Sequence, residues 1–221
     1  MGSRKVGFVT IGQSPRTDII EDLKPLLGAL EIIERGALDG LSPNELEAVA
    51  PLPDETPYVS RLFDGSQILL SPEKILPLLQ KAVDSVVGSG AEMVVVLCTG
   101  SFPTLQCPTP LLLPGRLLRG FVKGVLPLEG TLGVVVPLYK QTATAMESWN
   151  SITPHVHTAS LSPYLDFAAG MEKCQTLVGC DLIVMDCLGY TTRHKEMLKR
   201  LLNIPVVLAR TVMARAVQEL I

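Results

Sequence analysis

The sequence has few aromatic residues, few charged residues and no long apolar run. Aromatic side chains make up 5% of the 221 residues and charged side chains 19%, whereas 47% of the residues are hydrophobic. A chain so poor in charge has the composition of a folded protein and not of a disordered one. Its longest apolar runs, such as 93–98, have strand length and fall far short of the about 20 residues of a membrane helix. We therefore expect no signal peptide and no membrane partner.

Strongly basic segments and a disulfide-like cysteine pattern are also missing. The 19 Lys and Arg residues are outnumbered by 22 Asp and Glu residues, for a net charge of −3, which argues against nucleic acid as a partner. The five cysteines are odd in number and lack a framework spacing, which indicates a reducing compartment and a cytoplasmic location. Cys180, Cys187 and His194 match no zinc pattern, and His155 and His157 have no third ligand nearby in sequence, so we expect no metal.

The chain does contain an alternation of short apolar strands and helical segments. Strands are expected at 6–11, 30–35, 93–98, 132–136, 156–160, 182–186 and 206–208. Alternation of this kind predicts a mainly parallel α/β sheet.

Capping signals predict where the first two helices begin. Ser14 and Pro15 have the pattern of an N-cap followed by proline at the first helical position, which predicts a helix to about residue 30. Ser42 and Glu45 form the pattern of a capping box, which predicts a short helix there.

A hairpin and a longer helix are predicted next. Residues 58–70 alternate as two strands around Asp64 and Gly65, a pair that favours a type I′ turn. We interpret this hairpin as a flap over a cleft or an oligomer contact. Residues 71–86 then predict an amphipathic helix, which Pro77 should kink or restart.

The most informative feature is an internal repeat. Residues 90–100 align without gaps on 179–189, and each copy has a glycine, an acidic residue, an apolar strand and a Cys-x-Gly ending. Two further parallels flank it: 7–9 with 133–135, and 110–113 with 205–208. Two similar α/β lobes with mainly parallel sheets, related by a pseudo-twofold axis, are the economical explanation.

The repeat also suggests how the chain is divided. The segment after each cysteine is expected to cross to the other lobe. We therefore assign 1–108 plus 209–221 to the first lobe and 109–208 to the second.

Cys98 and Cys187 close the two copies of the repeat. Ligands of parallel sheets gather beyond the carboxyl ends of the strands, which is where both thiols are predicted. Two thiols facing one site can invert a stereocentre next to a carboxylate, because one removes the α-proton and the other returns a proton to the opposite face. We predict Cys98 and Cys187 as the catalytic residues, with N–H groups at the following loops, including Gly100 and Gly189, binding the carboxylate.

The competing interpretation is that these cysteines are small buried hydrophobes. We favour that interpretation for Cys107, Cys174 and Cys180, which the repeat does not match.

Other polar residues are candidates for binding a carboxylate. Arg16, near a helix N-terminus, can act as a bidentate partner. Thr99, Ser101 and Tyr190 lie on the two loops after the cysteines, where they are equally explained as caps or loop residues. Asp186 should point away from Cys187 and anchor a loop. His194 is expected on a solvated face.

The sequence resembles the AroM family over essentially its whole length. The most specific segments are 10–16, 186–190 followed by Arg193 and His194, and 202–208. The family is similar in turn to the aspartate/glutamate/hydantoin racemase superfamily. The resemblance implies a two-lobed racemase-like fold, no cofactor, a cysteine at one strand end of each lobe, and a substrate-binding first loop at 12–16 that includes Gln13, Ser14 and Arg16.

Two departures leave the reaction open. Amino-acid racemases usually have Cys-Asn-Thr and Cys-Thr-His where this chain has Cys-Thr-Gly at 98–100 and Cys-Leu-Gly at 187–189. The leading hypothesis is cofactor-independent racemase-like or isomerase-like acid–base chemistry at the α-carbon of a small carboxylate. The alternatives are a non-catalytic carboxylate-binding or regulatory protein, and a single-cysteine decarboxylase or isomerase of the same superfamily. A homodimer is the default expectation for the assembly.

Overall fold

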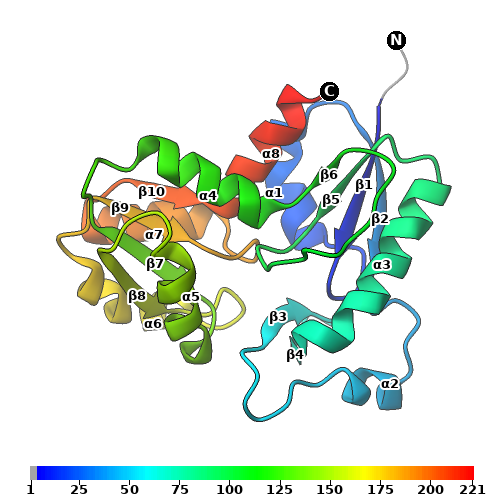
Figure 1. Cartoon of the computed structure of the whole chain (residues 1–221), viewed down its shortest axis with the longest axis horizontal. Coiled ribbons are helices and arrows are strands. Elements are labelled where there is room, and N and C mark those ends of the chain that lie inside the picture. The colour runs from blue at the N-terminus through cyan, green and yellow to red at the C-terminus, as the bar shows by residue number, and fades with distance from the viewer. Residues whose placement is uncertain (1–3) are drawn as a thin grey trace. The chain divides into compact units, whose positions relative to one another are not determined.

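The computed structural model describes residues 4–221, which form two compact units (Figure 1). The first unit comprises the chain up to Pro114 together with Ala214–Ile221, and the second comprises Gly115–Met213. Among the described residues, no helix is long and apolar enough to cross a membrane.

The first unit is built on a parallel four-stranded sheet in the order β2–β1–β5–β6. Its strands are β1 (Lys5–Thr10), β2 (Glu31–Gly36), β5 (Met93–Val96) and β6 (Leu111–Leu112). Three helices, α1 (Thr17–Leu27), α2 (Pro43–Ala48) and α3 (Pro72–Gly88), and an antiparallel hairpin of β3 (Tyr58–Arg61) and β4 (Gln67–Leu70) complete it. The predicted apolar face of α3 is the buried one: Ile75, Leu79, Ala82, Val83 and Val86.

The second unit has a parallel four-stranded sheet in the order β8–β7–β9–β10. Its strands are β7 (Leu132–Val136), β8 (Val156–Ser160), β9 (Leu182–Met185) and β10 (Val206–Leu208). The helices of this half of the chain are α4 (Pro114–Val125), η1 (Tyr139–Gln141), α5 (Thr142–Trp149), α6 (Phe167–Gly170), η2 (Met171–Leu177), α7 (Thr192–Leu202) and α8 (Ala209–Glu219), the last of which ends in the first unit. The parallel α/β class predicted from the strand and helix pattern is confirmed.

Strand register confirms the internal repeat residue by residue. Gly7 pairs with Val94 in the first sheet, and the equivalent Gly133 pairs with Ile183 in the second. The backbone N–H of Val94 donates to the Pro110 carbonyl at 2.9 Å, and that of Ile183 donates to the Pro205 carbonyl at the same distance. The two sheets therefore share one strand order and one register. β6 belongs to the first sheet, whereas the sequence assigned 109–112 to the second lobe.

The repeated glycine before β5 and β9 has a conformational reason. Gly90 has a φ of +89° and Gly179 a φ of +91°, a region that residues with a Cβ rarely adopt. The acidic residue of each copy then bonds the neighbouring strand, since Glu92 accepts from the Lys5 N–H at 3.1 Å and Asp181 from the Thr131 N–H at 2.8 Å.

Two local predictions were wrong in detail, and one of the two outcomes predicted for Pro77 did not occur. Ser14 does not cap α1; its N–H and hydroxyl donate to Asp39, and α1 begins after Arg16. The hairpin is not closed by a two-residue type I′ turn, because Gly65 has a positive φ of 88° but Asp64 does not, and the five residues 62–66 separate the last pair of the ladder. α3 runs through Pro77 without restarting. The capping box of Ser42 and Glu45 is confirmed.

Candidate functional site

The two cysteine loops have the same local geometry. Cys98 follows β5, and its Sγ accepts the backbone N–H of Gly100 at 3.3 Å. Cys187 follows β9, and its Sγ accepts the N–H of Gly189, also at 3.3 Å. Both thiols are half-buried. In each loop the sulfur thus faces the backbone N–H of the residue two positions on.

A tyrosine packs against each of these glycines. A Cβ on Gly100 would lie 2.8 Å from Cζ of Tyr58, and a Cβ on Gly189 would lie 2.6 Å from the hydroxyl oxygen of Tyr164. Any larger residue would push the tyrosine or the loop away. Close packing of the tyrosine therefore accounts for the glycine of each Cys-x-Gly ending.

Tyr58 fixes the loop after Cys98. Its hydroxyl donates to the Ser101 carbonyl at 3.1 Å and accepts from the Ser101 N–H at 3.2 Å. Burial, with a smaller contribution from the Cys98 thiol, raises the pKa of Tyr58 to about 12, so the hydroxyl keeps its proton at neutral pH. Tyr58 belongs to the hairpin, which gives this predicted element a definite contact with the Cys98 loop. The sequence alone offered no signal for this role.

The loop after Cys187 is fixed by different partners. The fully buried Arg210 donates to the Leu188 carbonyl from Nε at 2.9 Å and from Nη2 at 2.6 Å. Asp186 accepts from Trp149 Nε1 at 2.8 Å, which agrees with the predicted anchoring role. Tyr190 is fully buried and donates to the Leu161 carbonyl at 2.7 Å. Burial holds the pKa of Tyr190 well above its usual value.

His194 is not on a solvated face. Its ring stacks on Phe167 with centroids 4.1 Å apart, and its Nδ1 accepts the Thr191 N–H at 3.2 Å in the cap of α7. The hydrophobic neighbour comes from α6, far away in sequence, which is why the flanking Arg193 and Lys195 were misleading.

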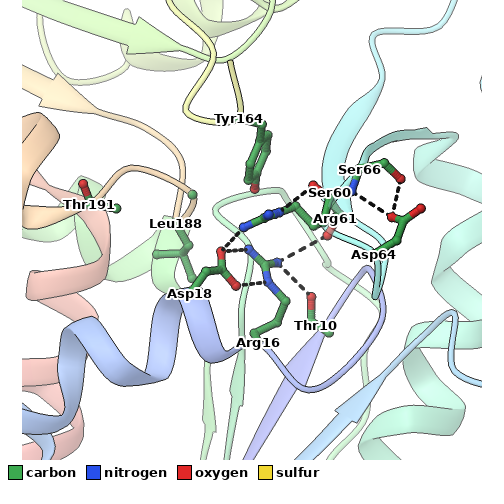
Figure 2. Close-up of polar contacts among 12 residues, drawn as sticks. Thr10, Arg16, Asp18, Ser60, Arg61, Asp64, Ser66, Tyr164, Leu188 and Thr191 are labelled. Carbon is green, nitrogen blue, oxygen red and sulfur yellow. Dashed lines mark hydrogen bonds and ion pairs between the residues drawn. The ribbon is translucent and has the colours of Figure 1, made fainter. Parts of the chain in front are cut away.

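The first loop is held together by Arg16 (Figure 2). The guanidinium is buried and makes a bidentate pair with Asp18, both N···O distances being 2.8 Å. It also donates to Thr10 at 3.3 Å and to Ser60 of the hairpin at 3.5 Å. The carboxylate that pairs with Arg16 is thus the side chain of Asp18, in the first turn of α1. Asp18, two residues on, was the available sequence signal.

The other predicted residues of this loop tie it to its surroundings. Gln13 donates to the Leu38 carbonyl at 3.4 Å and accepts from the Phe63 N–H at 2.7 Å. The Ser14 hydroxyl donates to Asp39 at 2.6 Å. Of the residues after Cys98, Thr99 is half-buried and Ser101 exposed.

Of the three remaining cysteines, all predicted to be buried, two are buried and one is half-buried. Cys174 and Cys180 are buried in the core of the second unit, and Cys107 is half-buried beside Thr109. Burial raises the pKa of Cys174 to about 11, so this thiol stays neutral. Among residues 4–221, no three His, Cys, Asp or Glu side chains gather as a metal site would require.

Solved structures of the racemase-like class share this fold. Allantoin racemase from Klebsiella pneumoniae matches with a TM-score of 0.60 and 14% identity, covering 99% of this chain and 87% of that one. Glutamate racemase from Aquifex pyrophilus matches with a TM-score of 0.63 and 11% identity over 98% and 84% of the two chains. Unliganded arylmalonate decarboxylase matches with a TM-score of 0.63 and 14% identity over 99% and 92%. These likenesses define the fold class.

The family is defined by sequence. The model of the AroM protein family matches residues 6–221, and the chain belongs to that family. No curated protein matches the chain in sequence.

Proposed function

We propose that this protein catalyses cofactor-independent proton transfer at the α-carbon of a small carboxylate, with Cys187 and Cys98 as the acid–base pair. The observation that carries the proposal is the matched pair of N–H···Sγ contacts, 3.3 Å in each loop. The same N–H···Sγ geometry occurs at two equivalent strand ends, while the residues around the two cysteines differ. A core packing role would need neither the glycine donor nor the partial exposure.

The reaction moves one proton at each face of the α-carbon. One thiolate removes the α-proton and becomes a thiol, leaving a planar enolate. The other thiol then donates its proton to the opposite face and becomes the thiolate. The configuration is inverted, the protons balance, and the reverse reaction uses the same two groups in exchanged roles. No cofactor is needed, and the thiols must stay reduced, so we place the protein in the cytoplasm.

The substrate carboxylate needs donors near the cysteines. The side chains of Thr99 and Ser101 and the N–H groups of the two loops are the groups that we assign to it. Arg16 and Tyr190 are engaged by Asp18 and by the Leu161 carbonyl, so in this proposal they position their loops. Gln13 and Ser14 position the first loop in the same way.

The test is solvent isotope exchange. The full chain is incubated in deuterated water with single enantiomers of small 2-substituted carboxylates and hydantoin-like amides, and α-deuteration and inversion are followed by NMR and chiral chromatography. We expect exchange in the native protein and its loss in Cys187→Ser and Cys98→Ser. The matched control, Cys107→Ser, should exchange normally. Exchange that survives in both site variants would refute the mechanism.

A second assay tests whether the two thiols can serve one substrate. A short bis-electrophile should join Cys98 to Cys187 within native protein and should fail to do so in urea. Peptide mapping identifies the bridge. Failure to bridge two thiols that each react singly would refute the paired mechanism.

The alternatives give different results in the same experiments. A single-cysteine decarboxylase, the reaction named for one of the structural neighbours, would release CO2 from a substituted malonate and depend on only one of the two cysteines. A non-catalytic carboxylate-binding protein would gain thermal stability with ligand in the native protein and in both cysteine variants, without turnover.

A further inference from the structure

The first loop, residues 12–16, and the loop that contains Cys98 lie at the same edge of the first sheet. β1 and β5 are neighbouring parallel strands in which Val9 pairs with Val96. The first loop follows β1, and Cys98 follows β5. The carboxyl ends of parallel strands share one edge of a sheet, so the two loops are brought to the same side of the unit. The strand β3 of the hairpin contacts both of them.

One end of β3 packs directly against the first loop. The Gln13 N–H donates to the Arg61 carbonyl at 3.1 Å. Nη1 of the buried Arg16 donates to the Ser60 hydroxyl at 3.5 Å (Figure 2). A Cβ on Gly12 would lie 2.4 Å from both the Arg61 carbonyl oxygen and the Ser60 hydroxyl oxygen. The loop and the strand are therefore in close contact over several residues.

An ion pair adds a link between β3 and the helix that follows the first loop. Asp18, which holds Arg16 through two bonds of 2.8 Å, also lies 3.6 Å from Nη1 of Arg61. Arg61 is fixed on its own hairpin as well, because its Nε donates to the Gly65 carbonyl at 2.9 Å. Removing the charge of Asp18 thus changes how both guanidinium groups are held.

The other end of β3 holds the Cys98 loop. The Tyr58 hydroxyl bonds the carbonyl and the N–H of Ser101, and its ring packs against Gly100. Gly100 in turn donates its N–H to Cys98 Sγ. Side chains alternate along a strand, so Tyr58 and the buried Ser60 face the same side of β3. One of these two side chains contacts each loop.

We propose that Ser60 and Tyr58 are positioning residues through which β3 couples the first loop to the Cys98 thiol. When the first loop changes its hold on Ser60, β3 shifts with Tyr58, which moves the Gly100 N–H that faces the sulfur. Closely packed contacts pass such a displacement on, because they leave no space to absorb it. The inference rests on the proposed function, since it takes Cys98 as a thiol of the site, but its test measures thiol reactivity and needs no turnover.

The test is a double-mutant cycle on the reactivity of Cys98 in the full chain. The rate of alkylation by iodoacetamide is measured across a pH series, and peptide mapping separates Cys98 from Cys107, a half-buried reference thiol in the same unit. Asp18→Asn should change the Cys98 rate by at least about twofold, and by much less when Tyr58→Phe is also present. The pH profile of Cys107 should stay the same in every variant, which a general loss of structure would not allow.

Two further variants sharpen the cycle. Glu21→Gln removes an acidic side chain from the exposed side of α1 and should leave the Cys98 rate unchanged. Ser60→Ala removes only a hydroxyl; it should change the Cys98 rate, and less than additively with Asp18→Asn. Circular dichroism confirms that each variant is folded. The proposal is overturned by an unchanged Cys98 rate in Asp18→Asn, or by an effect of Asp18→Asn that is equally large with and without Tyr58→Phe, since that effect would be directly electrostatic.

The coupling and the proposed reaction can fail separately. Coupling in the alkylation assay without any isotope exchange would refute the reaction and leave the coupling in place. Isotope exchange that depends on Cys98, together with additive effects of Asp18→Asn and Tyr58→Phe, would refute the coupling and leave the reaction in place.

Discussion

The loop after β5 and the loop after β9 hold their cysteines in the same way but are supported by different neighbours. In the first, Tyr58 of an antiparallel hairpin bonds the backbone of Ser101. In the second, the buried Arg210 bonds the Leu188 carbonyl and Trp149 bonds Asp186. The two copies of the repeat thus share the strand, the cysteine and the glycine donor, whereas the side chains that bond each loop are different.

This comparison distinguishes the residues that set the geometry at each sulfur from those that hold each loop in place. The residues that set the sulfur geometry are local, because a strand end and a glycine two positions later suffice. The residues that support each loop are distant in sequence and differ between the two lobes. We expect the Cys187 loop to be the more strongly held, because a buried guanidinium makes charge-assisted bonds where Tyr58 makes neutral ones.

The largest effect is expected from Arg210→Met. It removes both charge-assisted bonds to the Leu188 carbonyl inside a buried site, so the free energy of unfolding should fall by about 3 kcal/mol. Urea denaturation measures the change. Arg210→Lys, which keeps the charge but not the fork of donors, should recover only part of it. Full stability in the methionine variant would show that the Cys187 loop does not depend on this residue.

The repeated glycines provide a comparison at matched positions. Gly90→Ala and Gly179→Ala should each cost about 1–2 kcal/mol, because both backbones have a φ near +90°. Backbone strain is the main cost, since a Cβ would meet nothing closer than Lys5 Cδ at 3.9 Å from Gly90 and nothing within 4 Å of Gly179. Thermal denaturation measures both. Gly88→Ala, at the end of α3 with ordinary φ, is the control and should not destabilise. If the two substitutions reduced the stability by clearly different amounts, the two positions would not be structurally equivalent.

A smaller loss is expected from Tyr58→Phe. The ring stays against Gly100, but the two bonds to Ser101 are lost, which should cost about 1 kcal/mol. If the proposed chemistry is correct, reactivity of the Cys98 thiol toward an alkylating agent should change while that of Cys187 stays the same. Equal changes at both thiols would contradict a support confined to one lobe.

The smallest effect concerns alkaline titration. Burial raises the pKa of Tyr58 to about 12 and that of the fully buried Tyr190 further, so the protonated forms are favoured in the folded state. Their contribution to stability is complete below pH 10 and is lost as the pH rises toward and beyond 12. Ultraviolet absorbance should show Tyr58 ionising only near pH 12, and Tyr190 only on unfolding. Tyr58→Phe should remove the step near pH 12 alone.

Much of the fold could be predicted because its signals are local. Apolar runs predicted every strand of both sheets except the short β6, which the sequence grouped with the second lobe. The gapless match of 90–100 to 179–189 predicted the equivalence that the strand register confirms. Prediction failed where a partner came from elsewhere: Ser14 bonds Asp39 instead of capping a helix, and His194 stacks on Phe167. A propensity describes neighbours in sequence, and these contacts join residues that only the fold brings together.

The sequence by itself therefore determined the fold class of this protein and singled out the two cysteines that end the copies of the repeat. The scarcity of charge and aromatics, the aliphatic strands and the repeat were enough for two parallel α/β sheets, since periodicity and composition act along the chain. Tertiary structure decided what supports the cysteine loops: the tyrosine against each glycine, the bonds of Tyr58 to Ser101, and the buried Arg210 on the Leu188 carbonyl. Hydrogen bonds and close packing depend on distances in space, which no spacing along the sequence specifies.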